Sequence, residues 1–560
     1  MDKVSNIGKR IVHKWTTKDG LLGDYDYAYL FTPTLPFVSK GHKIQPFFGL
    51  DDDIPVVLGF ILGLQHALSM LAGLCTPPLI IAGYAYLSDE LSQYLVSVSL
   101  IISGVLSSIQ ITRIHIPFTP YYIGTGLVSV VGTSFATITI VTKAFPMMYK
   151  NGDCPIAEDG TYLACPDGYG SLLGTAACCG LLEILLSFMP PKLLQKVFPP
   201  IVTGPVVLLI GVSLISSGFE DFVGGSSCVG STCGKQNYAW GSAQFIGLGF
   251  LVYVTIILCE KWGSPIMKSC AVICGLLVGC IVSAACGYFS HDNIDAAPAA
   301  TFMWVHTFKL SVYGPAVLPM LACYIVLMME AIGDITATCD VSRTDIDGPL
   351  YDSRIQGGVL ADGFNGVISA LMTMTPLSTF AQNNGVISIT KCASRSVGYW
   401  CCFFLIVMGV FSKFAAALVA IPKAVLGGMT TFLFTSVAVS GMRIIATTAF
   451  TRRDRFILTC SLMFGFGATL VSDWFDYVFT YDGGNSSLKG FYNAIILVME
   501  TGFAVTGFIG VILNLFIPQE ADENDSAELI EEHVVTDEFN DEQGSSSISG
   551  KAEKDVSTKV

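Results

Sequence analysis

Apolar residues form long continuous runs along this chain, separated by short polar segments. A run of roughly 17–25 apolar residues is long enough to cross a bilayer as a helix, and the sequence contains about fourteen such runs. The predicted spans are 54–86, 91–110, 122–148, 170–189, 198–217, 241–259, 266–287, 314–333, 359–376, 380–396, 399–420, 425–445, 456–472 and 490–516. The pattern therefore predicts an all-α polytopic membrane protein.

Composition excludes two other classes of protein. Of the 560 residues, 52% are hydrophobic and 13% are charged, whereas about 25% of the residues in soluble domains are charged. A cytosolic enzyme and a disordered chain are therefore both excluded. The formal net charge is −14, and no basic patch indicates binding to nucleic acid.

Negative charge gathers at the C-terminus. Residues 520–560 contain 13 acidic and 3 basic residues, a net charge of −10, which leaves only −4 for the rest of the chain. Few aromatic residues occur there. We therefore expect segment 517–560 to be an acidic disordered tail.

Arginine positions predict how the spans are oriented, because basic residues favour the cytoplasmic side of a membrane. With the N-terminal tail, 1–53, in the cytoplasm and fourteen crossings, all nine arginines fall on the inner side and both termini are cytoplasmic. Lysines follow this rule less closely. The nine arginines are Arg10, Arg113, Arg343, Arg354, Arg395, Arg443, Arg452, Arg453 and Arg455.

The loops that this orientation places outside carry four cysteines and a glycosylation sequence. Cys154 with Cys165, and Cys228 with Cys233, would face an oxidising space, where each pair forms either a disulfide or two free thiols. The sequence Asn-Ser-Ser at 485–487 is an acceptor for N-glycosylation. The remaining cysteines lie mostly in apolar spans, where packing is the expected role.

The third and tenth spans, 122–148 and 380–396, have polar centres. Their glycine, β-branched and amide residues favour extended or broken backbone, which at membrane depth must be buried in protein or line a cavity. The third and tenth positions are equivalent in two halves of seven spans, and halves with an odd number of crossings are inverted relative to each other. Interrupted spans in matching positions are typical of a transporter site. The sequence thus predicts a 7+7 inverted repeat with short extended stretches in spans 3 and 10.

Ionisable residues inside the predicted spans are further candidates, because intramembrane charge is costly and usually functional. For each, the alternative is a hydrogen-bonded structural group. Glu330 and Asp334 lie four residues apart on one helix face, with Asp334 expected at the end of its span. Asp362 opens the ninth span. The other candidates are Glu183 and Glu500, isolated in apolar runs, and His66 in the first span.

Several of these residues belong to motifs that resemble those of the nucleobase–ascorbate transporter family, also called nucleobase–cation symporter 2. Segment 382–391, Gln-Asn-Asn-Gly-Val-Ile-Ser-Ile-Thr-Lys, resembles the family signature. Gln65-His66, segment 134–136 and segment 330–334 match further motifs. The resemblance covers residues 20–517. Within the family, the run Asp24-Tyr25-Asp26-Tyr27 and segment 375–383 resemble the fungal uric acid–xanthine permeases.

This resemblance implies an architecture and an activity. A core domain, 54–189 and 314–420, would move against a gate domain, 198–287 and 425–516, in a homodimer. The activity would be uptake of purines, xanthine and uric acid above all, across the plasma membrane. The proton would be the coupling ion, and no other cofactor is implied.

The motif match also implies the substrate ligands. Glu330 and Gln382 would bind the purine, with Phe135 and the Ala381 backbone completing the pocket. The chemistry is suitable, because a carboxylate accepts two ring N–H bonds and a primary amide both donates and accepts. Phe135 offers a face for stacking, although core packing is its simpler role.

Further roles follow from the same match. The residues implied in proton coupling or in the transport motion are Asp362, Asn383, Asp334 and His66; neutralising Asp362 with a proton would permit the loaded core to move. Gly385 and Thr390 belong to the signature. Lys391 stands where fungal members often have arginine, which keeps the charge but not the bidentate geometry and affects the expected fine specificity. Thr501 and Phe503 align less securely with selectivity positions on the outer path.

Two alternatives remain. The same architecture could carry another nucleobase, ascorbate or an anion, although a buried Glu330 disfavours an anion and the acidic tail is too short for the folded C-terminal domain that anion carriers often have. A membrane-embedded enzyme or receptor is the second alternative. No H-E-x-x-H metal motif, nucleophile elbow or phosphate loop occurs, so neither catalysis nor a metal site is predicted.

Overall fold

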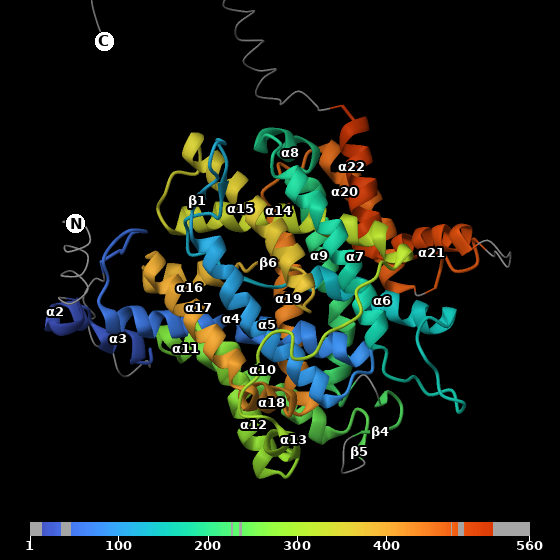
Figure 1. Cartoon of the computed structure of the whole chain (residues 1–560), viewed down its shortest axis with the longest axis horizontal. Coiled ribbons are helices and arrows are strands. Elements are labelled where there is room, and N and C mark those ends of the chain that lie inside the picture. Colours follow the sequence, from blue (N-terminus) through green and yellow to red (C-terminus); the bar gives the residue numbers. More distant parts are fainter. Residues whose placement is uncertain are drawn as a thin grey trace, which may run out of the picture.

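The structure is a computed structural model that describes residues 14–34, 46–225, 228–233, 238–471, 473–479 and 486–518. The predictions for the acidic tail beyond residue 518 and for the glycosylation acceptor Asn485 lie outside the described residues. The described chain is predominantly helical, with short two-stranded pairs in place of any larger sheet (Figure 1).

Each of the fourteen predicted spans coincides with a helix, a helix pair or a strand followed by a helix. The first seven contain α4 (Val56–Tyr84), α5 (Asp89–Ile111), β3 (Val131–Thr133) with α6 (Phe135–Asn151), α7 (Pro166–Leu186), α9 (Pro200–Phe222), α10 (Ala243–Trp262), and α11 (Pro265–Ser269) with α12 (Ala271–Ala285). The last seven contain α14 (Val317–Val341), α15 (Pro349–Leu371), β6 (Leu377–Thr379) with α16 (Gln382–Thr390), α17 (Arg395–Val410) with α18 (Ser412–Val419), α19 (Lys423–Ile445), α20 (Arg452–Leu470), and α21 (Ser486–Glu500) with α22 (Gly502–Phe516).

Short elements connect these spans. The helical ones are α2 (Lys18–Leu21), α3 (Tyr27–Phe31), α8 (Pro191–Val197), α13 (Asp292–Ala296) and the 3₁₀ turn η2 (Gly314–Ala316). The strand pairs are β1 (Ile114–His115) with β2 (Tyr122–Ile123), and β4 (Thr232–Cys233) with β5 (Tyr238–Ala239). Both predicted cysteine pairs form disulfides, Cys154–Cys165 and Cys228–Cys233.

Among the described residues, seven helices are long and apolar enough to cross a membrane alone, and nine spans result if each bent helix pair counts as one. The bent pairs are α17 with α18, at 78°, and α21 with α22, at 86°. The remaining spans fail this test because they are interrupted or polar. Such segments persist in a bilayer because neighbouring protein satisfies their backbone and polar groups.

Three predicted boundaries are wrong in ways that matter for the site. α14 continues to Val341, so Asp334 lies inside the helix and not at its end. α15 begins at Pro349, ten residues before the predicted span, which places Asp362 in mid-helix. Span 380–396 is a short helix, and its last residues already belong to α17. Hydropathy marks where apolar residues stop, whereas proline at the first helical position and cooperative hydrogen bonding set where a helix starts and ends.

The two interrupted spans pair with each other through their strands. β3 and β6 run antiparallel, with Val131 opposite Thr379 and Thr133 opposite Leu377. All six strand residues are buried. Each strand leads directly into a helix, α6 or α16, so matching strand–helix units approach each other from opposite directions.

The long helices pack in two groups. One contains α4, α5, α7, α14, α15 and α17, and the other contains α9, α10, α12, α19, α20 and α22. In the second group α9 lies along α19 at very short range: a Cβ on Gly211 would stand 2.3 Å from the Ala438 nitrogen, and one on Gly441 would stand 2.3 Å from the Leu208 nitrogen. Small residues of this kind allow helices to approach closely in membranes.

Part of the segment predicted as an N-terminal tail is folded. Leu30, in α3, is fully buried, and Tyr25 is nearly so. Both belong to an apolar cluster with the first turns of α4 and α17. The Thr34 N–H donates to the Trp262 carbonyl at 3.0 Å. Residues 14–34 therefore contact both helix groups, at the edge of the molecule where α3 lies beside α11 (Figure 1).

Candidate functional site

The β3–β6 pair brings the starts of α6 and α16 together. Phe135, the first residue of α6, stacks on Phe380, with ring centroids 6.1 Å apart and planes at 7°. Phe380 fits only because two neighbours are glycines: a Cβ on Gly73 would stand 2.8 Å from its ring, and one on Gly132 would stand 2.7 Å from it. Ala381 follows and is exposed, so the turn that begins α16 is open to a ligand.

A polar stripe of α14 faces this junction. Glu330, Asp334 and Thr338 follow one another at helical spacing. The Asp334 Oδ2 accepts a hydrogen bond from the Thr379 hydroxyl at 3.2 Å, and the Thr338 hydroxyl donates to the Asn384 Oδ1 at 2.7 Å. These two bonds tie the stripe to β6 and α16, and Glu330 occupies the next turn.

The predicted substrate ligands keep their polar groups available. Glu330 and Gln382 are both half-buried, and in the described part of the chain neither side chain is held in a hydrogen bond by the protein. Phe135 is also half-buried and packs against an apolar cluster that includes Leu327, one turn before Glu330 on α14. A carboxyl group, an amide and an aromatic ring are thus supplied by three adjoining helices.

Asn383 lies behind the open turn of α16. It is 1% exposed, and its amide donates to the Phe380 carbonyl at 3.2 Å. Its Oδ1 lies 2.9 Å from the Nδ1 of His66, which is fully buried in α4. His66 therefore supports the first turn of α16 through Asn383. Because Asn383 lies between them, His66 does not contact the open side of that turn directly.

Asp362 lies apart from this open turn. Its carboxyl group is 0% exposed, and in the described structure neither oxygen meets a hydrogen-bond donor in standard geometry. A neighbouring acid is Glu183 of α7, which is equally buried. The Ser378 hydroxyl, in β6, is the neighbouring polar group on the side of the strand pair.

The signature residues divide between the two ends of α16. Gly385 is exposed, with open space where a Cβ would stand, and it lies one turn from Gln382. Thr390 is buried and donates to the Val386 carbonyl. Lys391 ends the helix with a left-handed backbone, φ +55°, and is exposed. At 1.5 Å per residue, Lys391 stands roughly 13 Å along the helix from Gln382, so it does not line the same turn.

A cavity of about 690 Å³ opens beside the second half of α6. Thr501 and Phe503, the predicted selectivity residues, lie in its wall and are almost fully buried. Phe503 belongs to the same apolar cluster as Phe434, whose ring meets that of Phe135 edge to face, with centroids 5.7 Å apart. Through this cluster, Phe503 in the cavity wall is linked to the aromatic residues around Phe135.

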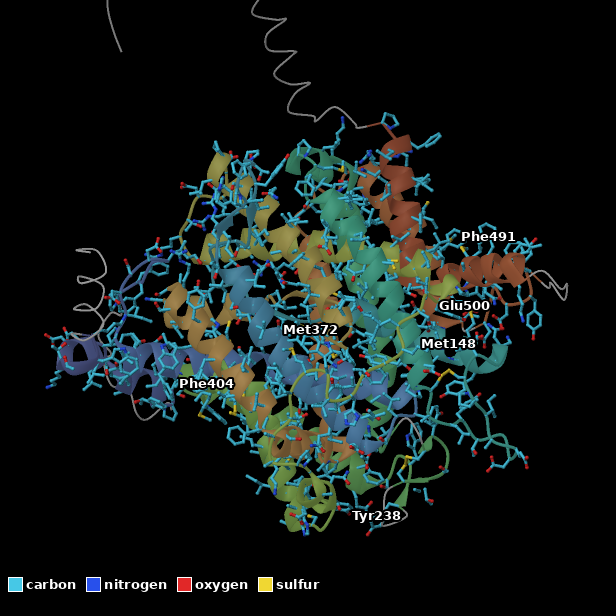
Figure 2. The ribbon with its side chains drawn as sticks, viewed as in Figure 1. Met148, Tyr238, Met372, Phe404, Phe491 and Glu500 are labelled. Carbon is cyan, nitrogen blue, oxygen red and sulfur yellow. A yellow bond between two sulfur atoms is a disulfide. The ribbon has the colours of Figure 1, made fainter. Side chains whose placement is uncertain are left out.

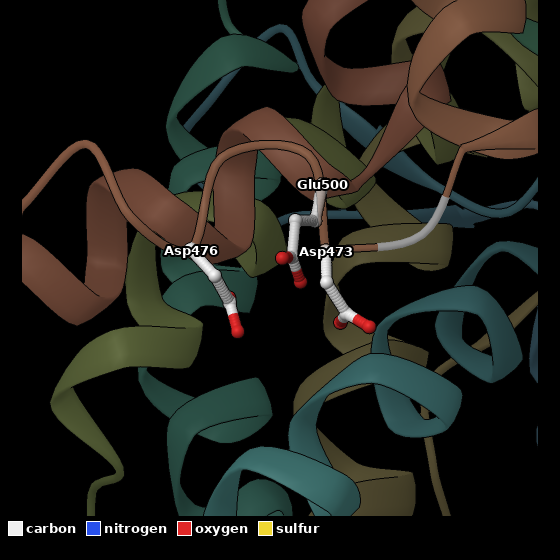
Figure 3. Close-up of side chains that lie close together, drawn as sticks. All are labelled: Asp473, Asp476 and Glu500. Carbon is white, nitrogen blue, oxygen red and sulfur yellow. The ribbon is translucent and has the colours of Figure 1, made fainter.

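The rim of this cavity carries opposite charges. Glu500, at the end of α21, lies near the end of α6, where Met148 is labelled in Figure 2. Carboxyl oxygens of Asp473, Asp476 and Glu500 lie within 4.8 Å of one another (Figure 3). The Lys150 ammonium is 2.6 Å from the Asp476 Oδ2, so a side-chain cation already compensates part of this negative charge.

The ion pair affects both of its members. Burial acts to raise the pKa of Asp476, but hydrogen bonds with Lys150 and Glu500 outweigh it, and the pKa of Asp476 is lowered. The same hydrogen bond raises the pKa of Lys150. The pair therefore stays ionised across the neutral and mildly acidic range.

Sequence reasoning missed three parts of this arrangement. Phe380 and Phe434, which pack against Phe135, carry no signal beyond being apolar. The cavity-lining Lys150 and its acidic partner are far apart in the sequence. In the sequence, Glu183 is an isolated acid within an apolar run, and no pattern connects it with Asp362 on another helix.

Comparisons with known proteins identify the family of this chain. The family model Xan_ur_permease, described as a permease family, matches residues 59–473. A "Purine permease" of Emericella nidulans is 59% identical over 94% of this chain and 93% of its own. A "Uric acid-xanthine permease" of the same organism is 61% identical over 91% of this chain and 89% of its own. The "Xanthine permease XanQ" of Escherichia coli is 32% identical over 84% of this chain and 93% of its own.

Solved structures support the fold alone. The murine anion transporter Slc26a9 in its inward-facing state has a TM-score of 0.53 at 11% identity, covering 91% of this chain and 75% of its own. A second SLC26A9 structure has a TM-score of 0.50 at 12% identity, covering 77% of this chain and 70% of its own. Both results agree with the 7+7 organisation. The protein is a membrane transporter and not an enzyme, and its chain belongs to the nucleobase–ascorbate transporter family of permeases.

Proposed function

We propose that this protein takes up purines, xanthine and uric acid in particular, by proton-coupled alternating access at the plasma membrane. The observation that carries the proposal is that no described residue hydrogen-bonds the side chain of Glu330 or Gln382, on the helices that adjoin the one beginning at Phe135. The names of the fungal relatives, purine permease and uric acid–xanthine permease, support the same substrates.

The site chemistry fits a flat, polar ring. Xanthine and urate carry alternating N–H and C=O groups at their edges. Glu330 would accept ring N–H groups, Gln382 would pair with an adjacent C=O and N–H, and Phe135 would cover a ring face. A site of this kind rejects analogues that lack one group, because a buried polar atom then remains unpaired.

Alternating access needs two bodies that move against each other. We assign spans 1–4 and 8–11 to a core that holds the site and spans 5–7 and 12–14 to a gate. The separate packing of the two helix groups supports this division. So does the apolar cluster of Phe135, Phe434 and Phe503, in which residues of the core meet residues of the gate.

We assign the cavity beside α6 to the outer side of the plasma membrane and both termini to the cytoplasm. The arginine distribution favours this orientation. The two disulfides lie in loops that it exposes to an oxidising space. A homodimer remains part of the proposal, through family membership alone.

The deciding experiment measures uptake of radiolabelled xanthine in cells that lack purine carriers of their own, at acidic and at mildly alkaline pH. We expect saturable uptake that falls at alkaline pH and is inhibited by unlabelled urate but not by uracil or ascorbate. Glu330→Ala, with surface expression verified, should abolish it. No xanthine uptake by a wild-type protein shown to reach the surface would overturn the cargo assignment, and inhibition by ascorbate or uracil would favour the alternative substrates.

A further inference from the structure

Two fully buried acids from different helices face each other behind the strand pair. We propose that Glu183 and Asp362 form a single proton-binding site, a carboxyl pair that carries the coupling proton. This inference rests on the proposed proton-coupled uptake and assigns that proton to two residues. Glu183 acts as a partner that positions and shares the proton, with no contact to the substrate.

The helices that carry the pair approach very closely. A Cβ on Gly363, the residue after Asp362, would stand 3.1 Å from the Glu183 Cγ and 2.9 Å from the Ile184 nitrogen. Both carboxyl groups are 0% exposed. The two carboxyl groups are close enough to interact through a hydrogen bond, and the Ser378 hydroxyl is a second neighbour of Asp362. In the described structure, none of the four carboxyl oxygens has a hydrogen bond in standard geometry. A proton held between them supplies the hydrogen bond that this geometry lacks.

The surroundings offer no compensating charge. The titratable groups that face the pair from α14 are Glu330 and Asp334, both acids, the thiol of Cys323, and Tyr324, whose hydroxyl donates to a backbone carbonyl of α7 at 2.9 Å. Ser378, in β6, is a neutral neighbour of Asp362. Among the described neighbours of the two carboxyl groups there is no lysine, arginine or histidine.

Charge arithmetic then limits the states of the pair. Two carboxylates side by side in a dry interface would combine desolvation with like-charge repulsion, and no partner offsets either cost. The pair therefore carries at most one negative charge. Binding one further proton takes its charge from −1 to 0, and release of that proton restores −1, so that one proton crosses with each cycle. The two groups titrate as a unit.

The position of the pair links this charge to the substrate turn. Ser378 lies beside Asp362, and Phe380 and Ala381 follow on the same strand and turn. A neutral pair removes the uncompensated charge that the pair itself places behind β6. The strand–helix unit that holds the substrate can then move across the apolar gate without carrying that charge.

Transport measurements on the Glu183→Gln variant distinguish proton binding by Glu183 from a purely structural role. Glutamine keeps the size of the side chain but cannot carry the proton. In proteoliposomes, wild-type protein should accumulate xanthine by up to about tenfold per unit of inward pH gradient, one proton per substrate. Glu183→Gln should lose accumulation and retain xanthine counterflow, since the substrate site is intact. Glu183→Asp should restore part of the accumulation. Glu260→Gln, the same change at an exposed position of α10, is the matched control.

A second measurement reports the proton directly and needs no transport. Infrared difference spectra of purified protein titrated with acid and base should contain a protonated-carboxyl C=O band that both Glu183→Gln and Asp362→Asn alter. Accumulation by Glu183→Gln equal to wild type, or a band unchanged by that substitution, would overturn the shared site. Loss of pH-driven accumulation by the wild type itself would instead refute the proposed proton coupling, while the infrared result still decides whether the pair holds a proton.

Discussion

The Nδ1 of His66 and the Oδ1 of Asn383 lie 2.9 Å apart and join the first span to the first turn of α16. The Asn383 amide nitrogen donates to the Phe380 carbonyl, so its oxygen must be the acceptor toward His66. The histidine Nδ1 therefore carries a proton, and this fixes the tautomer. The buried amide of Asn383, the residue next to Gln382, thus connects His66 of α4 with the backbone of Phe380.

Removing either member of this bond should destabilise the site. His66→Ala leaves a buried amide oxygen without a donor, at a cost of about 1–3 kcal/mol. We expect a lower unfolding temperature in detergent and slower xanthine uptake. Asn383→Ala should have a similar effect, and the double substitution should cost less than the sum, because the two residues share one interaction. Strictly additive losses would contradict the coupling.

Glu330 should govern affinity for the purine. Because it makes no hydrogen bond within the described protein, Glu330→Gln should leave the unfolding temperature nearly unchanged and weaken xanthine binding by about 10–100-fold, the loss of a charged hydrogen bond. Equilibrium binding of radiolabelled xanthine to purified protein measures this directly. Thr336→Val, on another face of α14, serves as the control, and equal affinities for Glu330→Gln and wild type would remove Glu330 from the site.

Gly132 should be intolerant of a side chain. A Cβ there would stand 2.6 Å from Leu74 and 2.7 Å from the ring of Phe380, and overpacking of this kind costs about 1–3 kcal/mol. Gly132→Ala should therefore reduce thermal stability and uptake together, and Phe380→Leu in the same chain should restore stability in part. Gly247→Ala, on α10 with open space at that position, should be neutral. No rescue by the second change would show that the clash lies with Leu74.

The Lys150–Asp476 pair should be insensitive to pH during transport. The folded-state pKa of Asp476 is lowered, so its contribution is present above the ordinary aspartate pKa of about 3.9 and is lost only as the pH falls through the lowered value. The raised pKa of Lys150 keeps its charge up to about pH 10. Lys150→Ala should therefore change uptake by the same small factor at acidic and at mildly alkaline pH, consistent with about 0.2–1 kcal/mol for an exposed pair.

A charge reversal provides the control for this prediction. Lys150→Asp alone places a fourth acid among Asp473, Asp476 and Glu500 and should reduce uptake more than Lys150→Ala does. Adding Asp476→Lys should recover most of the loss. An effect of Lys150→Ala that appears only at acidic pH would show that the cavity rim, and not only the buried carboxyl pair, takes part in proton coupling.

The membrane class, the approximate positions of the fourteen spans and the two interrupted spans can all be predicted from the amino-acid sequence, because long apolar runs and polar breaks are local properties of the chain. The short motifs identified the family, and through it Glu330, Gln382 and Phe135 became the candidate substrate ligands. The same local reading misplaced the ends of α14 and α15, and with them Asp334 and Asp362, since the ends of helices depend on capping and packing more than on hydropathy.

Which of these residues come into contact depends on the folding of the whole chain. Antiparallel pairing of β3 with β6 sets Phe135 on Phe380, and glycines at Gly73 and Gly132 make room for that ring. Close approach of α7 and α15 turns Glu183, which looked like an isolated acid, into the partner of Asp362. Such contacts join residues far apart in the chain, and they form because burial of apolar faces brings helices together at spacings that no local pattern specifies.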